Sequence, residues 1–437
     1  MRKFNLLIWC LISILPAGCR YANKPKGKIK NQKITPIQAL TLPGVNSEGP
    51  YLFAGKGILM INWTEWYQNK SKNILKMALF NPQTGKFGEA RIIKPSKGLQ
   101  MHAESMAKVG MTAKGILYAI YRKKSPDDHS RFGGKLYYTI SKDTGKTWSD
   151  ELLLVEDSAA TSLSFFDLDL LPDGELGIIW LDNRKPIDSL HKGKTLFFAK
   201  TDGDKGFTGF KPIAGSTCEC CRTDIYTDSK GRIHVAYRNI IEPDEPGFDG
   251  KADMEIRDMF YLFSADTGKT FTKPVRIGYD NWHVAGCPHT GPSLAYNGKV
   301  LAAVWFTGKP HAEGLYFAVK EDTMKGFYPK VSIATEGRHP QMIAQGKRFF
   351  AVYEEYYEKN GKGFYKIVLN EPDGFNFVDK RFAGNITGKM PGKTTEISMP
   401  ETRNNHPAIA LTPHNKKLVA WVNTDTRNPK IMYRLCY

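Results

Sequence analysis

The stretch "SKDTGKTW", Ser141–Trp148, has the pattern S-x-D-x-G-x-T-W, and it recurs as "SADTGKTF" at Ser264–Phe271. In such a stretch an aspartate caps the backbone of a tight turn, a glycine takes the left-handed conformation and an aromatic ring packs below. The residues expected in these roles are Ser141, Asp143, Gly145 and Trp148 in the first turn and Ser264, Asp266, Gly268 and Phe271 in the second. Degenerate copies occupy 81–88 and 201–210. The turns join strands of hairpins that repeat along the chain.

Seven segments share a second pattern, in which a polar start leads into an apolar strand, a turn, and another strand that ends on an aromatic residue. They span 49–63, 102–121, 166–180, 222–237, 291–305, 339–353 and 406–421. The closing aromatics are Trp63, Tyr121, Trp180, Tyr237, Trp305, Tyr353 and Trp421. Further hairpins, such as 135–155 and 259–277, lie between these segments. Two hairpins per repeat form a four-stranded sheet, and radial repetition of such sheets makes a β-propeller.

The two ends of the chain fit the closure of such a ring. The last repeat ends with a single strand at 430–437, and the segment 32–42 supplies the strand that this repeat lacks. Closure of this kind removes an exposed sheet edge. The sequence therefore predicts an all-β protein in which residues 32–437 form one β-propeller of seven four-stranded blades, closed by an N-terminal strand. Six blades is the alternative if one repeat belongs to a split blade.

These turns and repeats resemble the sialidase superfamily, whose propellers carry Asp-box (BNR) repeats, along nearly the whole chain. Three further motifs are similar to those of a subgroup of exported sialidase-like bacterial proteins. They are "CECCRTD" (218–224), "EIRDM" (255–259) and "DNWHVAGCPHTGP" (280–292). The resemblance implies a sialidase-like propeller fold and, as one function, a glycoside hydrolase that acts on an acidic glycan.

The catalytic residues of sialidases carry over only in part. No Arg-Ile-Pro occurs in this chain. The resemblance implies an arginine cluster, an acid, a tyrosine nucleophile and a glutamate partner. The candidates for these roles are Arg222, Asp224, Arg338, Glu354, Glu355 and Tyr356. Glu354, Glu355 and Tyr356 are equally well interpreted as a rim of strand-end residues.

The N-terminus predicts export. Residues 1–18 combine a basic start with an apolar run and small residues before Cys19, as in a bacterial lipoprotein signal peptide. Cys19 is the expected lipidation site, with ordinary cleavage near Ala17 as the alternative, and 19–31 form a basic tether. We expect an outer-membrane lipoprotein on the periplasmic or surface face, which argues against nucleic acid as a partner.

The charge of the chain favours acidic partners. The formal net charge is +18, and loss of the signal peptide, which carries only Arg2 and Lys3 as charges, leaves about +16. Such a surface attracts the membrane, an acidic glycan or an envelope protein.

Cysteines and histidines fall at the starts of first strands, which line one mouth of a propeller channel. Cys218, Cys220, Cys221, Cys287 and His289 belong to neighbouring repeats, and His102, His339 and His406 occupy similar places in theirs. Thiolates and imidazoles are ligands that copper and zinc prefer, so the first five are candidate metal ligands and the other three are further candidates. A structural disulfide and thiol redox chemistry stay open for the cysteines.

Three functions follow from these observations. The favoured hypothesis is an envelope-anchored propeller whose axial Cys/His site binds copper or zinc and serves binding or a metal-dependent step. The second is the glycoside hydrolase, or a lyase-like enzyme, on an acidic glycan. The third is a passive module that binds a glycan or a protein.

Overall fold

The structure is a computed structural model that describes residues 34–67, 72–124, 133–184, 192–241, 255–284, 286–328, 330–372, 392–425 and 427–437. The predicted signal peptide (1–18), Cys19 and the tether (19–31) lie outside the described residues. Apart from the short 3-10 helix η1 (Lys94–Ser96), the elements in these ranges are strands. No helix within these ranges is both long and apolar enough to cross a membrane.

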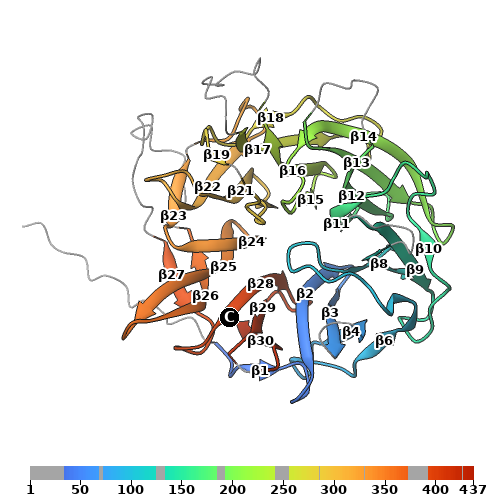
Figure 1. The fold of residues 1–437 in the computed structure, drawn as a ribbon, viewed down its shortest axis with the longest axis horizontal. Coiled ribbons are helices and arrows are strands. Elements are labelled where there is room, and N and C mark those ends of the chain that lie inside the picture. The colour runs from blue at the N-terminus through green and yellow to red at the C-terminus, as the bar shows by residue number, and fades with distance from the viewer. Residues whose placement is uncertain are drawn as a thin grey trace, which may run out of the picture.

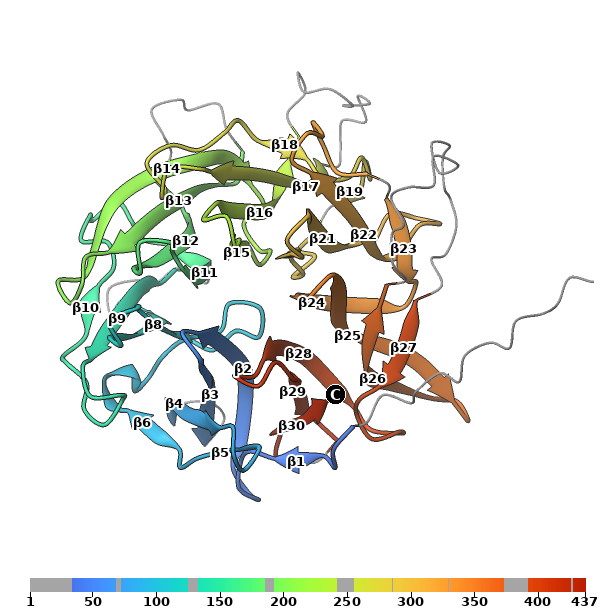
Figure 2. The same ribbon diagram turned by 180° about the vertical axis from the view of Figure 1, so that it is seen from behind.

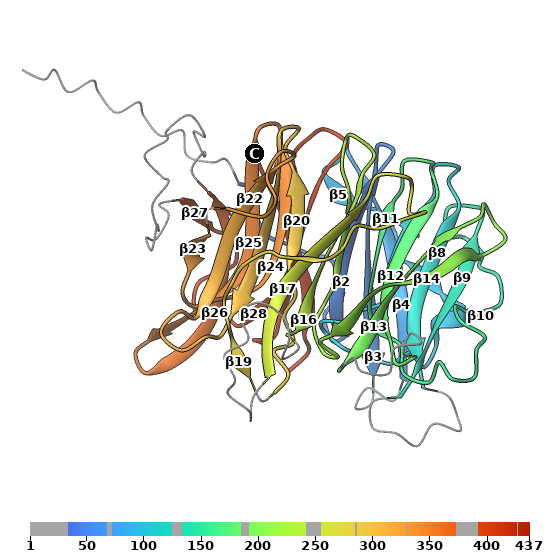
Figure 3. The same cartoon turned by 90° about the horizontal axis from the view of Figure 1, so that it is seen from above.

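Antiparallel strands form a ring of units around a central axis (Figure 1). The first unit contains β2 (Asn46–Gly55), β3 (Ile58–Tyr67), β4 (Lys72–Asn81), β5 (Lys86–Phe87) and β6 (Arg91–Ile93). The second contains β7 (Lys108–Met111), β8 (Leu117–Lys123), β9 (Lys135–Ser141) and β10 (Leu152–Leu153). Seen from the side, the units stand next to one another with their strands running between two faces of a disc (Figure 3).

The middle of the chain forms a nine-stranded sheet. Its first four strands are β11 (Ser164–Leu170), β12 (Leu176–Asp182), β13 (Lys194–Thr201) and β14 (Phe207–Thr217). The others are β15 (Asp224–Thr227), β16 (Ile233–Ile240), β17 (Glu255–Ser264), β18 (Val275–Arg276) and β19 (His283–Val284). The two halves are joined through the pair Thr217–Asn239 between β14 and β16. Because this pair merges two groups of strands, the number of blades stays a prediction.

The C-terminal part completes the ring. Two units contain β20 (Ser293–Tyr296), β21 (Val300–Thr307), β22 (Gly314–Glu321) and β23 (Val331–Ala334), then β24 (Gly337–Gln345), β25 (Arg348–Lys359), β26 (Lys362–Glu371) and β27 (Lys393–Glu396). The last unit contains β28 (Asn404–Leu411), β29 (Lys417–Asn423), β30 (Lys430–Cys436) and β1 (Gln38–Ala39). The N-terminal strand β1 pairs antiparallel with β30, as Figure 2 shows. The predicted all-β propeller closed by an N-terminal strand is confirmed.

The closing aromatics of the repeats hold the units together. All seven are buried in the structure. The indole N–H of Trp63 donates to Glu65 at 3.1 Å, and that of Trp180 donates to Asp182 at 3.0 Å. A ring of this size removes a large apolar area from water, and the bonded N–H avoids an unsatisfied buried donor. This explains why each repeat ends on an aromatic residue.

The first of the two predicted turns shows how the S-x-D-x-G pattern closes a hairpin. Asp143 Oδ1 accepts the backbone N–H groups of Lys146 and Thr147 at 3.0 and 2.9 Å. Ser141 Oγ accepts the N–H of Gly145, which has a φ of 86°. These bonds hold the pKa of Asp143 below its usual value, with the Thr147 contacts as the main cause.

Bulges at the start of four innermost strands aim side chains at the axis. The register of β2, β11, β24 and β28 shifts against its partner strand at this point. A bulge re-aims a side chain and needs an unusual backbone conformation. The residues in the left-handed region there are Gly49, Phe165, His339 and His406, with φ of 66, 47, 50 and 47°. Two histidines thus enter the axial face from equivalent positions.

Candidate functional site

His339 and His406 face each other at the axis. Their ring centroids are 4.7 Å apart. Glu354, on β25, steadies both residues: its Oε1 lies 2.8 Å from Nδ1 of His339, and its Oε2 accepts the backbone N–H of His406 at 2.9 Å. Burial lowers the pKa of His339, but the carboxylates of Glu104 and Glu354 outweigh this effect and raise it.

Glu104 completes this group, although the sequence patterns did not point to it. One ligand atom each of Glu104, His339 and His406 lies within 4.8 Å of the others, and we call these three residues the His–Glu triad. Burial raises the pKa of Glu104, but the charges of Arg222 and the two histidines outweigh it and hold the pKa below its usual value. The only sequence signal was its place in "HAES", two residues after His102.

The other two predicted histidines lie beside the triad. Nδ1 of His102 accepts the backbone N–H of Glu104 at 3.2 Å. The rings of His102 and His289 have centroids 5.4 Å apart. Burial, and then the charge of His289, lower the pKa of His102. The predicted metal-ligating role of these four histidines stays a prediction, but the structure brings all four to one region.

A groove with a volume of about 740 Å³ opens next to the triad. Its lining includes Trp282, Cys287, Phe306, Arg338, His339, Tyr356 and Tyr365, together with the acids Glu313 and Glu336. The ring of Tyr356 is exposed and lies edge-on to Tyr365, with centroids 5.4 Å apart. Glu355 is not among the residues that line the groove, and its carboxylate pairs with Lys366 at 2.9 Å. Of the predicted catalytic residues, Arg338 and Tyr356 therefore share this groove.

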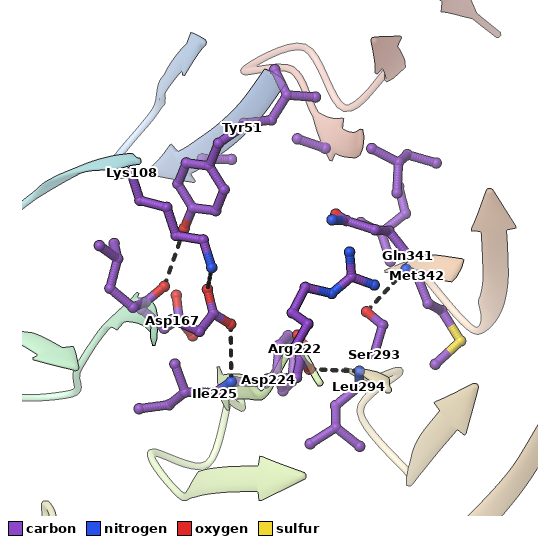
Figure 4. Close-up of a pocket in the computed structure, with 18 of the residues that line it drawn as sticks. Tyr51, Lys108, Asp167, Arg222, Asp224, Ile225, Ser293, Leu294, Gln341 and Met342 are labelled. Carbon is purple, nitrogen blue, oxygen red and sulfur yellow. Dashed lines mark hydrogen bonds and ion pairs between the residues drawn. The ribbon is translucent and has the colours of Figure 1, made fainter. Parts of the chain in front are cut away.

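A second cavity, of about 290 Å³, lies in the channel (Figure 4). Arg222 and Asp224 line it, so the structure places them apart from the groove. Nη2 of Arg222 donates to the carbonyl of Pro340 at 2.7 Å, and Asp224 accepts the N–H of Leu294 at 2.7 Å. Burial and the charge of Asp167 raise the pKa of Asp224 well above its usual value. Arg222 thus supports the backbone next to His339.

The three cysteines of "CECC" form a buried cluster. Sγ of Cys218 is 3.7 Å from Sγ of Cys220 and 3.5 Å from that of Cys221. Nη1 of Arg257 lies 3.4 Å from Sγ of Cys218. The contacts of the two neighbouring sulfurs, and then Arg257, lower the pKa of Cys218 well below its usual value. Burial raises the pKa of Cys221 to about 12.

Cys287 and His289, which were predicted as ligands with these sulfurs, do not join the cluster among the described residues. Cys287 is exposed and lines the groove, and His289 stands against His102. The five described cysteines are all free thiols in the structure. Arg257 links the cysteine cluster to the segment that contains Cys287, because its Nη1 also donates to the carbonyl of Gly286 at 2.9 Å.

The left-handed backbone at His406 gives a test of what this residue does. We expect His406→Gly to keep the free energy of unfolding unchanged or to raise it by up to ~1 kcal/mol, because glycine accepts φ near 47° without strain. Gly49 already occupies the equivalent bulge in β2. Urea denaturation of both proteins in the presence of a metal chelator would measure this change. A loss above about 2 kcal/mol would mean that the imidazole holds the fold and is not kept for function.

Comparisons with known proteins agree with the fold. No protein-family model matches the chain, and neither does a curated protein. Among solved structures, the polysaccharide lyase Uly1 matches with a TM-score of 0.54 and 14% identity, over 94% of this chain and 94% of the lyase. A protein of unknown function from Dyadobacter fermentans DSM 18053 matches with a TM-score of 0.48 and 14% identity, over 92% and 98% of the two chains.

The NanB sialidase from Streptococcus pneumoniae is a further match, with a TM-score of 0.44 and 9% identity over 92% of this chain and 93% of the sialidase. The propeller fold that the resemblance implied is confirmed by the arrangement of the strands and agrees with the Uly1 match. The lyase match shows the same fold, and at 14% identity it extends no further than the fold.

Proposed function

We propose that the chain binds an acidic glycan in the groove beside the His–Glu triad and cleaves it there. The observation that carries this proposal is Arg338. Its side chain is exposed in the groove, its guanidinium lies 5.6 Å from the centroid of the Phe306 ring, and it forms no ion pair among the described residues. A guanidinium with its donors available matches the two oxygens of a carboxylate.

The rest of the lining suits a sugar chain. Phe306 and Tyr365 offer apolar surface, with the buried Trp282 packed against Phe306. Ligand sites commonly combine such surface with a few polar groups that fix orientation. The positive net charge of +18 adds long-range attraction for a polyanion. An acidic polysaccharide therefore fits this groove better than a neutral one.

Groups for proton transfer also reach the groove. Tyr356 contributes a phenol on an exposed side chain, and Glu313 and Glu336 contribute carboxyl groups. Uly1, whose fold is similar, is a polysaccharide lyase, which is in line with this class of chemistry. A sialidase of the tyrosine-nucleophile type is less favoured, because Glu354 and Glu355 contact His339 and Lys366.

The test is a screen of acidic polysaccharides and sialosides, followed by size analysis of the products. We expect Arg338→Gln to lower kcat/KM on the cleaved glycan by about 100-fold, as expected for the loss of a charge-assisted pair worth ~3 kcal/mol. Arg348→Gln is the matched control, since Arg348 lies in the same strand pair and is bound to Glu371 at 2.8 Å. Failure of the folded chain to bind or cleave any uronate or sialic acid glycan would refute the proposal.

A second candidate function is favoured by the three sulfurs. We propose that Cys218, Cys220 and Cys221 bind copper or zinc. Sulfurs around a tetrahedral zinc with Zn–S bonds of ~2.3 Å stand about 3.8 Å apart, close to the separations of 3.5 and 3.7 Å within the cluster. The ion would fix the loop that leads directly into Arg222 and Asp224. Elemental analysis with thiol counting on purified protein tests this, and absence of metal after loading would exclude it.

The location of the chain is part of the same proposal. An exported lipoprotein, lipidated at Cys19 and held at the outer membrane, would meet acidic glycans at the cell envelope. The basic tether 19–31 would contact anionic head groups. Labelling of cells with a palmitate analogue, with Cys19→Ala as control, tests the anchor.

A further inference from the structure

We propose that the His–Glu triad holds a divalent transition-metal ion, at a site separate from the cysteine cluster. Glu104, His339 and His406 would each give one ligand atom. These atoms already lie within 4.8 Å of one another. A tetrahedral ion with bonds of ~2.0–2.1 Å needs donors about 3.3 Å apart, so small side-chain rotations complete the site.

The carboxylate of Glu104 is the strongest argument. Its side chain is only 2% exposed, and neither of its oxygens has a hydrogen bond among the described residues. The guanidinium of Arg222 lies 3.6 Å from Oε2 and Nε2 of His406 lies 3.8 Å from Oε1, both too long for a hydrogen bond. A buried carboxylate without hydrogen bonds is costly, and an ion between the three side chains would satisfy it.

The histidines are already oriented as metal ligands usually are. A metal-bound imidazole normally holds a carboxylate or carbonyl on its other ring nitrogen. Oε1 of Glu354 lies 2.8 Å from Nδ1 of His339, and Oδ1 of Asn405 lies 3.2 Å from Nδ1 of His406. Two imidazoles and one carboxylate form a donor set that suits zinc or iron(II).

The backbone supplies an independent argument. His339 and His406 both adopt left-handed conformations that cost about 1–3 kcal/mol in a residue other than glycine. Both precede a proline, as does Gly49 in the equivalent bulge of β2. Glycine occupies this bulge in β2, and Phe165 occupies it in β11 with a ring that packs in the core. The rings of His339 and His406 instead face each other beside Glu104.

The surrounding charges leave room for a cation. Glu104 and Glu354 bring two negative charges to the region, and Arg222 brings one positive charge. The rings of His102 and His289 stand next to this group. A metal binds the neutral form of the imidazoles, and in that state the three charged side chains carry a net negative charge that the ion offsets.

The ion would also be accessible from the groove, because His339 belongs to the triad and lines the groove. Three protein ligands leave an open position on the metal. This last step rests on the proposed function: the open position would take a carboxylate or hydroxyl oxygen of the bound glycan. The metal site itself does not depend on it.

The experiment counts ions in a chain without the cysteine cluster. Full-length Cys218→Ser/Cys220→Ser/Cys221→Ser protein is loaded with Zn²⁺, dialysed and analysed for zinc. We expect about one ion per chain, and a Kd at least 100-fold weaker after Glu104→Gln, in line with loss of one ligand. His414→Gln, in the turn between β28 and β29, is the matched control and should bind zinc as its parent does.

Cobalt gives a second measurement if the triple serine variant does not fold. Wild type loaded with Co²⁺ should show, besides thiolate charge-transfer bands, weaker bands of a nitrogen and oxygen site that disappear in Glu104→Gln. Zinc and cobalt binding that is unchanged by Glu104→Gln and by His406→Gln would overturn the proposal. Glycan cleavage plays no part in these readouts, so a failure of the proposed function stays distinguishable.

Discussion

Replacement of Lys108 by methionine should lower the free energy of unfolding by about 3–5 kcal/mol, the largest effect that we expect of a single substitution in this propeller. Nζ of Lys108 is buried and donates to Asp167 Oδ1 at 2.7 Å and to the carbonyl of Phe166 at 2.7 Å. Figure 4 shows this pair at the wall of the channel cavity, which Asp224 and Asp169 also line. Without the ammonium group, Asp167 becomes an uncompensated charge near two more carboxyl groups.

Equilibrium denaturation in urea at neutral pH would measure the loss. Lys114→Met is the control, because Lys114 is exposed in the turn between β7 and β8. The double variant Lys108→Met/Asp167→Leu should recover much of the stability, since it removes both charges together. A loss of unfolding free energy below about 1 kcal/mol in the single variant would contradict this account. It would show that water in the channel solvates the Lys108–Asp167 pair.

Removal of the metal from the cysteine cluster has the second largest expected effect. An ion that binds only the folded chain adds about 4 kcal/mol of apparent stability at a free concentration of 1,000 times Kd. A strong chelator should therefore lower the unfolding midpoint of the zinc-loaded protein. Cys221→Ser should show the lower unfolding midpoint even before chelator is added, because it lacks one buried ligand.

Cys436→Ala is the matched control for this measurement. Cys436 is buried in another part of the ring, against Trp421 and Val419 among others, and lies outside the cluster. Its variant should respond to the chelator as the wild type does. Equal midpoints with and without chelator would contradict a structural ion. They would favour the disulfide or redox alternatives for Cys218, Cys220 and Cys221.

The fold was predictable because its signals are local and repeated. A closing aromatic such as Trp180 or Trp305 must be buried wherever a blade forms, so its spacing marks the units. The pairing of β1 with β30 followed from a missing strand and an unused N-terminal segment. The number of blades was harder to predict, because the long strand β14 shifts in register against β13 and forms the single pair Thr217–Asn239 with β16.

The site was predictable only in part, since it depends on contacts between distant segments. His339 and His406 follow the repeat, and the alignment of repeats found them. Glu104 lies in a loop without strand periodicity, and its role depends on histidines more than 200 residues away. Cys287 and His289 lie in the same motif, but Cys287 lines the groove, whereas His289 contacts His102. Glu354 and Glu355 are neighbours whose side chains alternate between two faces of β25.

The measurement that tests the central claim most directly is the affinity for a defined acidic oligosaccharide. Titration calorimetry would compare a uronate hexasaccharide with a neutral hexasaccharide of the same linkage, for wild type and Arg338→Gln. We predict binding of the uronate alone, weakened by added salt and at least tenfold weaker in Arg338→Gln. Equal binding of both sugars, or an affinity that Arg338→Gln leaves unchanged, would contradict the assignment of this groove to an acidic glycan.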